Sequence, residues 1–85
     1  MGDYLMSIKD AVVLRIKQIC EQKNLAINAL ANLSGLTPST VYSIIYPKHK
    51  DVGIVSLKKL CDGMDISMAE FFDSDIFHGL EQEVE

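Results

Sequence analysis

The sequence has few cysteines and no long apolar run, and each shortage excludes a class of protein. Two cysteines, Cys20 and Cys61, are too few for a disulfide framework, and we expect them to be small buried apolar groups. No apolar run approaches the ~18 residues that a membrane span needs, and no basic-then-apolar leader precedes Ser7. We therefore expect a cytoplasmic protein that does not bind membranes.

Patterns typical of metal sites and catalysis are missing too. His49 and His78 lie on either side of Cys61 in the sequence, without the paired spacing of a metal site such as CxxC or HxxxH. There is no carboxylate pair in an apolar setting and no glycine-rich phosphate loop. We predict no metal, no cofactor and no enzymatic activity.

The length and composition are typical of one compact domain. The chain has 85 residues, of which 48% are apolar and 24% are charged, close to the averages of ~45–50% and ~25% for globular proteins. A chain of this size forms a single core. Disorder, a fibrous repeat and a coiled coil are therefore disfavoured.

The formal net charge of −4 hides an asymmetry along the chain. Residues 1–59 hold all eight lysines and arginines against four acidic residues, which gives 8 − 4 = +4. Residues 60–85 hold the other eight acidic residues and no lysine or arginine, which gives −8. This asymmetry indicates a basic working surface with an acidic segment attached to it.

Capping residues and apolar spacing predict an all-α fold of five helices. The third of them begins at Thr37-Pro38, where a threonine caps free N–H groups and a proline occupies the first helical position, and it ends at Pro47. The expected helices cover residues 7–22, 27–34, 38–46, 54–63 and a short stretch that starts at Ser67.

Helices 27–34 and 38–46 are joined by the tight turn Ser34-Gly35-Leu36. Gly35 lacks a Cβ and tolerates the left-handed conformation that ends a helix. Ala31, four residues earlier, is small enough to let the two helices approach closely. This is the arrangement of a helix-turn-helix, whose second helix can enter a major groove about 12 Å wide.

The order and spacing of these segments resemble the lambda-repressor and Cro-type (XRE-like) helix-turn-helix transcriptional regulators. The matching segments are Arg15-Ile16, ALANLSGLTPSTVYSII, SLKKLCDGM and ISMAEFF, which together span nearly all of the chain. The resemblance implies a five-helix, lambda-repressor-like DNA-binding domain over residues 1–73, followed by an acidic C-terminal tail over residues 74–85. It also implies a homodimer that binds double-stranded DNA at near-palindromic sites.

The resemblance further implies that helix 38–46 is the recognition helix. The positions that face DNA bases, named the reading face below, are Ser39, Thr40, Tyr42, Ser43 and Tyr46. None of them is Arg, Lys, Asn or Gln, the side chains that make bidentate contacts with bases. We expect phosphate contacts from Thr37, Lys48, His49, Lys50, Arg15, Lys17 and Asn28.

Some of these residues have structural alternatives. The two tyrosines could be partly buried against helix 54–63 or a dimer partner, and the basic triplet after Pro47 could be a solvated turn. Arg15 could form an internal ion pair with Glu70 or Asp62.

The tail over residues 74–85 is open to two interpretations. It is either a frayed extension or a short element that becomes ordered against a partner. Phe77 and Leu80 could accordingly form a dimer contact or dock the tail onto the domain.

The function that these patterns predict is a sequence-specific DNA-binding transcriptional regulator, a repressor rather than an activator. The alternative is a helix-turn-helix module that binds another protein, such as an antitoxin or an antirepressor. The uncharged, tyrosine-bearing recognition helix and the −8 segment favour that alternative.

Overall fold

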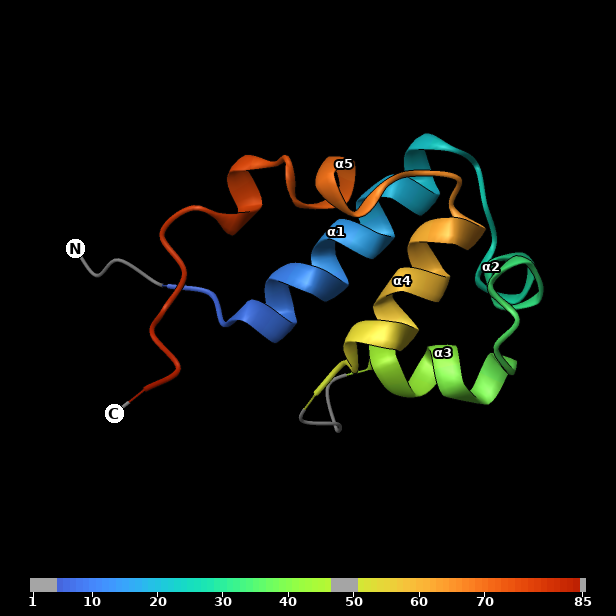
Figure 1. Ribbon diagram of the computed structural model, residues 1–85, viewed down its shortest axis with the longest axis horizontal. Coiled ribbons are helices and arrows are strands. Elements are labelled where there is room, and N and C mark those ends of the chain that lie inside the picture. The colour runs from blue at the N-terminus through green and yellow to red at the C-terminus, as the bar shows by residue number, and fades with distance from the viewer. Residues whose placement is uncertain (1–4, 47–50, 85) are drawn as a thin grey trace.

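The protein is a bundle of short helices in a computed structural model, which describes residues 5–46 and 51–84 (Figure 1). These residues contain no strand. The elements are α1 (Ile8–Gln22), α2 (Ile27–Ser34), α3 (Pro38–Ile45), α4 (Ile54–Gly63), α5 (Met68–Phe72) and the 3₁₀ helix η1 (Asp75–Phe77). The predicted all-α fold of five helices is confirmed.

Local capping residues set the ends of these helices. Gly35 has a φ of 69° directly after α2, the left-handed conformation expected at the turn. Ser67 and Glu70 form a capping box at the start of α5, the point at which the sequence predicts the fifth helix to begin. α3 ends at Ile45 and Tyr46 is extended, as the residue before a proline usually is.

One hydrophobic core lies between the helices. α2 packs against α3 and α4, and α4 also contacts α5. Cys20 and Cys61 are buried free thiols, as the sequence predicts. The largest fully buried side chains are Phe71, Ile16, Leu30, Leu60, Met64, Val41 and Cys61. α3 is held to this core by one side only, and its other side is left exposed.

The described part of the chain contains neither a helix suited to crossing a membrane nor a cluster of metal-binding side chains. None of its helices combines the length and the apolar content that crossing a membrane requires. Its histidine, cysteine and acidic side chains do not gather in groups of three or more that could hold a metal ion.

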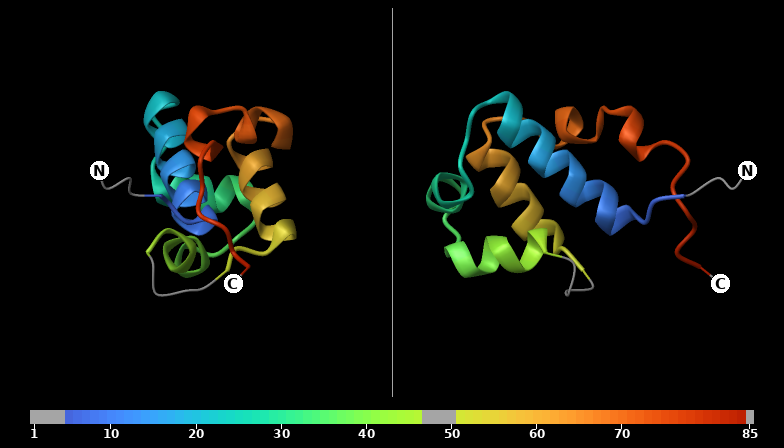
Figure 2. Two further views of the ribbon diagram at one scale, coloured as in Figure 1. Left: turned by 90° about the vertical axis from the view of Figure 1, so that its left-hand side faces the viewer. Right: turned by 180° about the vertical axis from the view of Figure 1, so that it is seen from behind.

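The 3₁₀ helix η1, which follows α5, packs on α1 and α5 (Figure 2). The Phe77 ring of η1 lies 5.9 Å from the Phe71 ring and 4.8 Å from the Phe72 ring, between ring centres. Farther along, the backbone N–H of Glu81 donates to the carbonyl oxygen of Met6 at 3.0 Å. Of the two alternatives for Phe77, the structure shows the docked tail. The division into a domain over 1–73 and a tail over 74–85 stays a prediction.

Candidate nucleic-acid interface

α3 divides cleanly into a buried and an exposed side. Val41, Ile44 and Ile45 point into the core, and their spacing is that of one helical face. Of the reading face predicted from the sequence, Ser43 is half-buried and the other four side chains are exposed. The exposed side expected from the spacing of the apolar residues is thus observed for these four side chains, whereas their contact with DNA bases stays a prediction.

Three hydroxyl groups gather at the amino end of α3. The Thr37 Oγ1 accepts a hydrogen bond from the backbone N–H of Thr40 at 3.2 Å, which is the predicted cap. The same oxygen lies 2.8 Å from the Thr40 Oγ1 and 3.3 Å from the Ser39 Oγ. A hydroxyl can donate and accept, so this cluster can bond to phosphate oxygens or to base edges.

The two tyrosines of the reading face stack on each other. The rings of Tyr42 and Tyr46 are 5.9 Å apart between centres and inclined by only 6°. Tyr42 is 40% exposed and Tyr46 is 56% exposed, so neither ring is buried within the chain. Each ring is only partly covered, and the alternatives of contact with α4 or with a dimer partner stay open.

Lys17 of α1 joins this surface. Its ammonium nitrogen lies 6.0 Å from the centre of the Tyr46 ring, at the limit of a cation–π contact. Lys17 and Tyr46 were predicted separately, as a phosphate contact and a reading-face residue. Their proximity was missed, because the two residues are far apart in the sequence and no periodicity links them.

Arg15 has internal partners. Its Nε donates to the carbonyl oxygen of Phe71 at 2.7 Å, and its Nη2 donates to the carbonyl oxygen of Glu70 at 2.8 Å. Its Nη1 donates to the Gln18 side chain at 2.8 Å. The guanidinium thus binds carbonyl groups at the end of α5, a helix terminus that otherwise leaves such groups unpaired.

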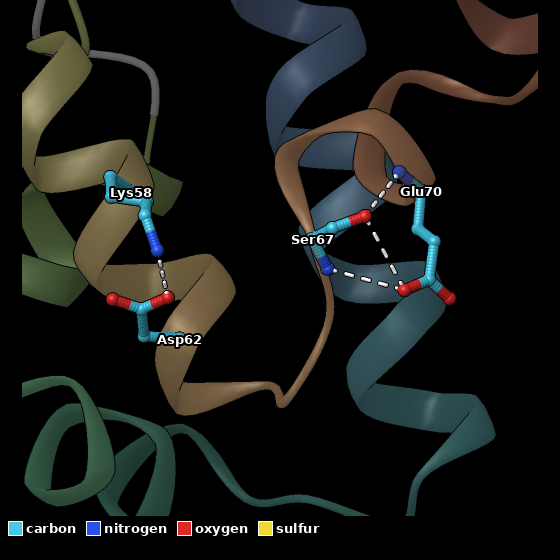
Figure 3. A network of polar contacts seen from close by, with 4 residues as sticks. All are labelled: Lys58, Asp62, Ser67 and Glu70. Carbon is cyan, nitrogen blue, oxygen red and sulfur yellow. Dashed lines mark hydrogen bonds and ion pairs between the residues drawn. The ribbon is translucent and has the colours of Figure 1, made fainter.

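Within the described residues, Arg15 does not form the ion pair with Glu70 or Asp62 that the sequence suggested as an alternative. Figure 3 shows the carboxylates of the two proposed partners bonded elsewhere. The Glu70 carboxylate accepts from the backbone N–H of Ser67 at 3.2 Å, and Asp62 pairs with Lys58 one turn away on α4. Arg15 therefore holds α5 through backbone oxygens rather than through a carboxylate.

Of the remaining predicted phosphate contacts, the structure describes only Asn28. Asn28 is exposed in the first turn of α2. It lies two residues after Ala26, the N-cap residue, whose side chain makes no capping hydrogen bond. Lys48, His49 and Lys50 lie outside the described residues.

Three acidic residues of α5, η1 and the link between them lie away from α3. Glu70 belongs to α5 and Asp75 to η1, and Asp73 lies between these two elements. In both figures α5 and η1 run along the upper edge of the molecule, whereas α3 forms the lower edge. A polyanion that approaches α3 therefore stays away from this acidic surface, whose charge would repel it.

Comparison with known proteins identifies the family of this fold. Residues 15–75 match the model of the Cro/C1-type helix-turn-helix DNA-binding domain. A comparison with curated protein sequences gives no match.

Solved structures of similar fold are regulators and a phage protein. The crystal structure of the prophage Lp1 protein 11 aligns with a TM-score of 0.74 and 31% identity over 82% of this chain and 92% of that chain. The restriction-modification controller protein C.AhdI from Aeromonas hydrophila aligns with a TM-score of 0.67 and 30% identity, covering 75% and 96% of the two chains. For the wild-type controller protein C.Esp1396I the values are 0.69 and 26%, covering 75% and 81%. The chain therefore belongs to the Cro/C1-type helix-turn-helix family and is a DNA-binding transcriptional regulator.

Proposed function

We propose that the protein is a sequence-specific transcriptional repressor that inserts α3 into the major groove of double-stranded DNA. The observation that carries the proposal is the exposed side of α3, with Tyr42 on the helix and Tyr46 directly after it, opposite the three residues that are buried in the core. An α-helix with its side chains is about 10–12 Å across, which matches a major groove of about 12 Å. In this proposal the reading face contacts the base edges.

Phosphate contacts surround the reading face in this proposal. Thr37 contributes its hydroxyl at the start of α3, and Lys17 contributes a charge beside Tyr46. Asn28 and the basic residues Lys48, His49 and Lys50 complete the set. Arg15 is left out, since its donors already bond to α5 and Gln18. Such contacts fix the position of the protein on DNA and carry no sequence information of their own.

Repression follows from occupancy in this proposal. The molecule is 41 Å long, and at 3.4 Å per base pair it would cover roughly 12 base pairs of a promoter. A protein lying there blocks access by other proteins. Because the target is DNA within the cell, we place the protein in the cytoplasm.

The proposed active form is a homodimer. Ile54 and Val55 at the start of α4 are 68% and 65% exposed, an apolar pair that a second copy could cover. Two copies related by a two-fold axis would place two α3 helices on the two halves of a near-palindromic site. Sedimentation equilibrium of the free protein measures this association.

An unbiased selection of bound duplexes with the purified protein tests the proposal. We expect one enriched near-palindromic sequence, bound more tightly than a shuffled duplex. Tyr42→Ala should reduce this preference, whereas Lys48→Ala combined with Lys50→Ala should weaken binding to both duplexes. No enrichment would contradict the proposal.

A heparin column distinguishes the proposed DNA-binding function from the alternative, a module that binds another protein. A basic DNA-binding surface is retained at low salt and released as the salt concentration rises. A protein that instead presents its acidic segment to a partner passes through at every salt concentration.

A further inference from the structure

We infer that the reading face recognises the C5-methyl group of pyrimidines through the ring of Tyr42. The preferred sites would then carry thymine where Tyr42 contacts DNA, and 5-methylcytosine would substitute for it there better than cytosine does. The inference rests on the proposed entry of α3 into the major groove. It adds the chemical group that is recognised and the residue that recognises it.

Hydrogen bonding leaves α3 with little power to distinguish bases. The helix, PSTVYSII, contains no Arg, Lys, Asn or Gln, so the bidentate contacts that identify guanine and adenine are not available to it. Its hydroxyl groups can donate and accept, which makes them compatible with every base. The hydroxyls of Ser39 and Thr40 are in addition already within hydrogen-bond distance of Thr37.

The stacked tyrosines supply a different kind of recognition. Tyr42 lies on α3 and Tyr46 follows the helix directly, four residues later, and their stacked rings form an exposed apolar pair beside the hydroxyl groups. Among the major-groove edges of the four bases, the apolar group is the C5-methyl of thymine. Cytosine has a hydrogen at the same carbon, and 5-methylcytosine restores the methyl group.

The two rings have different tasks in this inference. Tyr42 is the fifth of the eight residues of α3 and lies one turn nearer than Tyr46 to the amino end, from which side chains of a recognition helix reach base edges. Tyr46 lies at the helix end and has the ammonium of Lys17 at 6.0 Å from its ring centre. In this inference Tyr46 is a positioning residue that supports Tyr42 by stacking.

Deoxyuridine substitution in the selected duplex tests the inference. Each thymine of one half-site is replaced by deoxyuridine in turn, which removes only the methyl group. We expect at least one position at which wild-type affinity falls about fourfold, which is the loss expected when one buried methyl group no longer contributes to binding. Replacing that T·A pair with C·G should weaken binding, and methylation of the new cytosine at C5 should recover part of the loss.

Variants of Tyr42 identify the group that recognises the methyl. Tyr42→Phe keeps the ring and should still distinguish thymine from deoxyuridine. Tyr42→Ala removes the ring and should bind the two duplexes equally at the sensitive position. Loss of the discrimination in Tyr42→Phe, or its survival in Tyr42→Ala, would overturn the role given to the ring.

The failures of the two proposals are distinguishable. A selected duplex that is bound specifically, yet equally well with deoxyuridine at every thymine, overturns the methyl inference and leaves the proposed function intact. The absence of any preferred duplex overturns the proposed function itself.

Discussion

Ser34 of α2 and Gly63 of α4 are in direct contact where the two helices pack. A Cβ added to Gly63 would overlap the Ser34 Oγ and would lie 3.1 Å from the backbone nitrogen of Ser34 and 3.2 Å from the Leu30 Cδ1. The bare backbone at Gly63 therefore lets α4 approach α2, the helix that precedes α3. This contact helps to set where α3 lies.

Gly63→Ala should destabilise the protein. The hydroxyl of Ser34 can rotate away, but its backbone nitrogen cannot, so the helices must separate slightly. Overpacking of this kind costs about 1–3 kcal/mol. Urea denaturation measures the free energy of unfolding, and an unchanged value for Gly63→Ala would show that the two helices are not in close contact.

Ser34→Ala serves as the matched control and should recover part of that loss in the double variant. Within the described residues the buried Ser34 Oγ has no hydrogen-bond partner, so its removal alone should be neutral or slightly stabilising. If the effects of the two substitutions simply add, the proposed contact between them carries no energy.

Arg15→Lys should weaken the attachment of α5. Lysine keeps the charge but cannot bond to the two carbonyl oxygens of Phe71 and Glu70 with the planar geometry of arginine. Hydrogen bonds to charged groups contribute ~1.5–3 kcal/mol when buried, and the partial exposure of Arg15 reduces the expected loss to about 1–2 kcal/mol. Thermal unfolding measures the loss, and a midpoint identical to that of the wild type would refute this role.

Lys17→Gln should lower the salt dependence of DNA binding. Neutralising one fewer phosphate reduces the magnitude of the log–log slope of affinity against salt concentration by about 0.9. Lys23→Gln removes the same charge directly after α1, whose C-terminal end lies at the upper edge in Figure 1, opposite α3, and it is the matched control. Equal slopes for the two variants would show that Lys17 does not contact DNA phosphates.

The thiols should be unreactive in the folded protein. Burial raises the pKa of Cys20 and of Cys61 above the ordinary value of 9.0, so both stay protonated in the native state. Because the native state then holds protons that the unfolded state releases, stability should fall as the pH rises above about 9. Labelling by a thiol reagent at pH 8 should be slow until urea is added, and rapid labelling of the native protein would contradict the burial.

Local features of the fold were predictable from the sequence. The turn at Gly35, the cap at Thr37 and the capping box at Ser67 each depend on residues within four positions of one another. The exposed side of α3 followed in the same way, since one helix with three buried residues leaves its other side free.

Contacts between distant segments could not be predicted in this way. The bonds from Arg15 to the end of α5, the docking of Phe77 and the contact between Lys17 and Tyr46 join residues with no common spacing. Such pairs are set by how whole helices pack, which residue types and local periodicity do not determine.

An NMR titration of the isotope-labelled protein with the selected duplex tests most directly whether α3 enters the major groove of DNA. The backbone amide signals of residues 37 and 39–46 should shift most, together with those around Lys17 in α1. Shifts concentrated in α5 and η1, with α3 unchanged, would contradict the account.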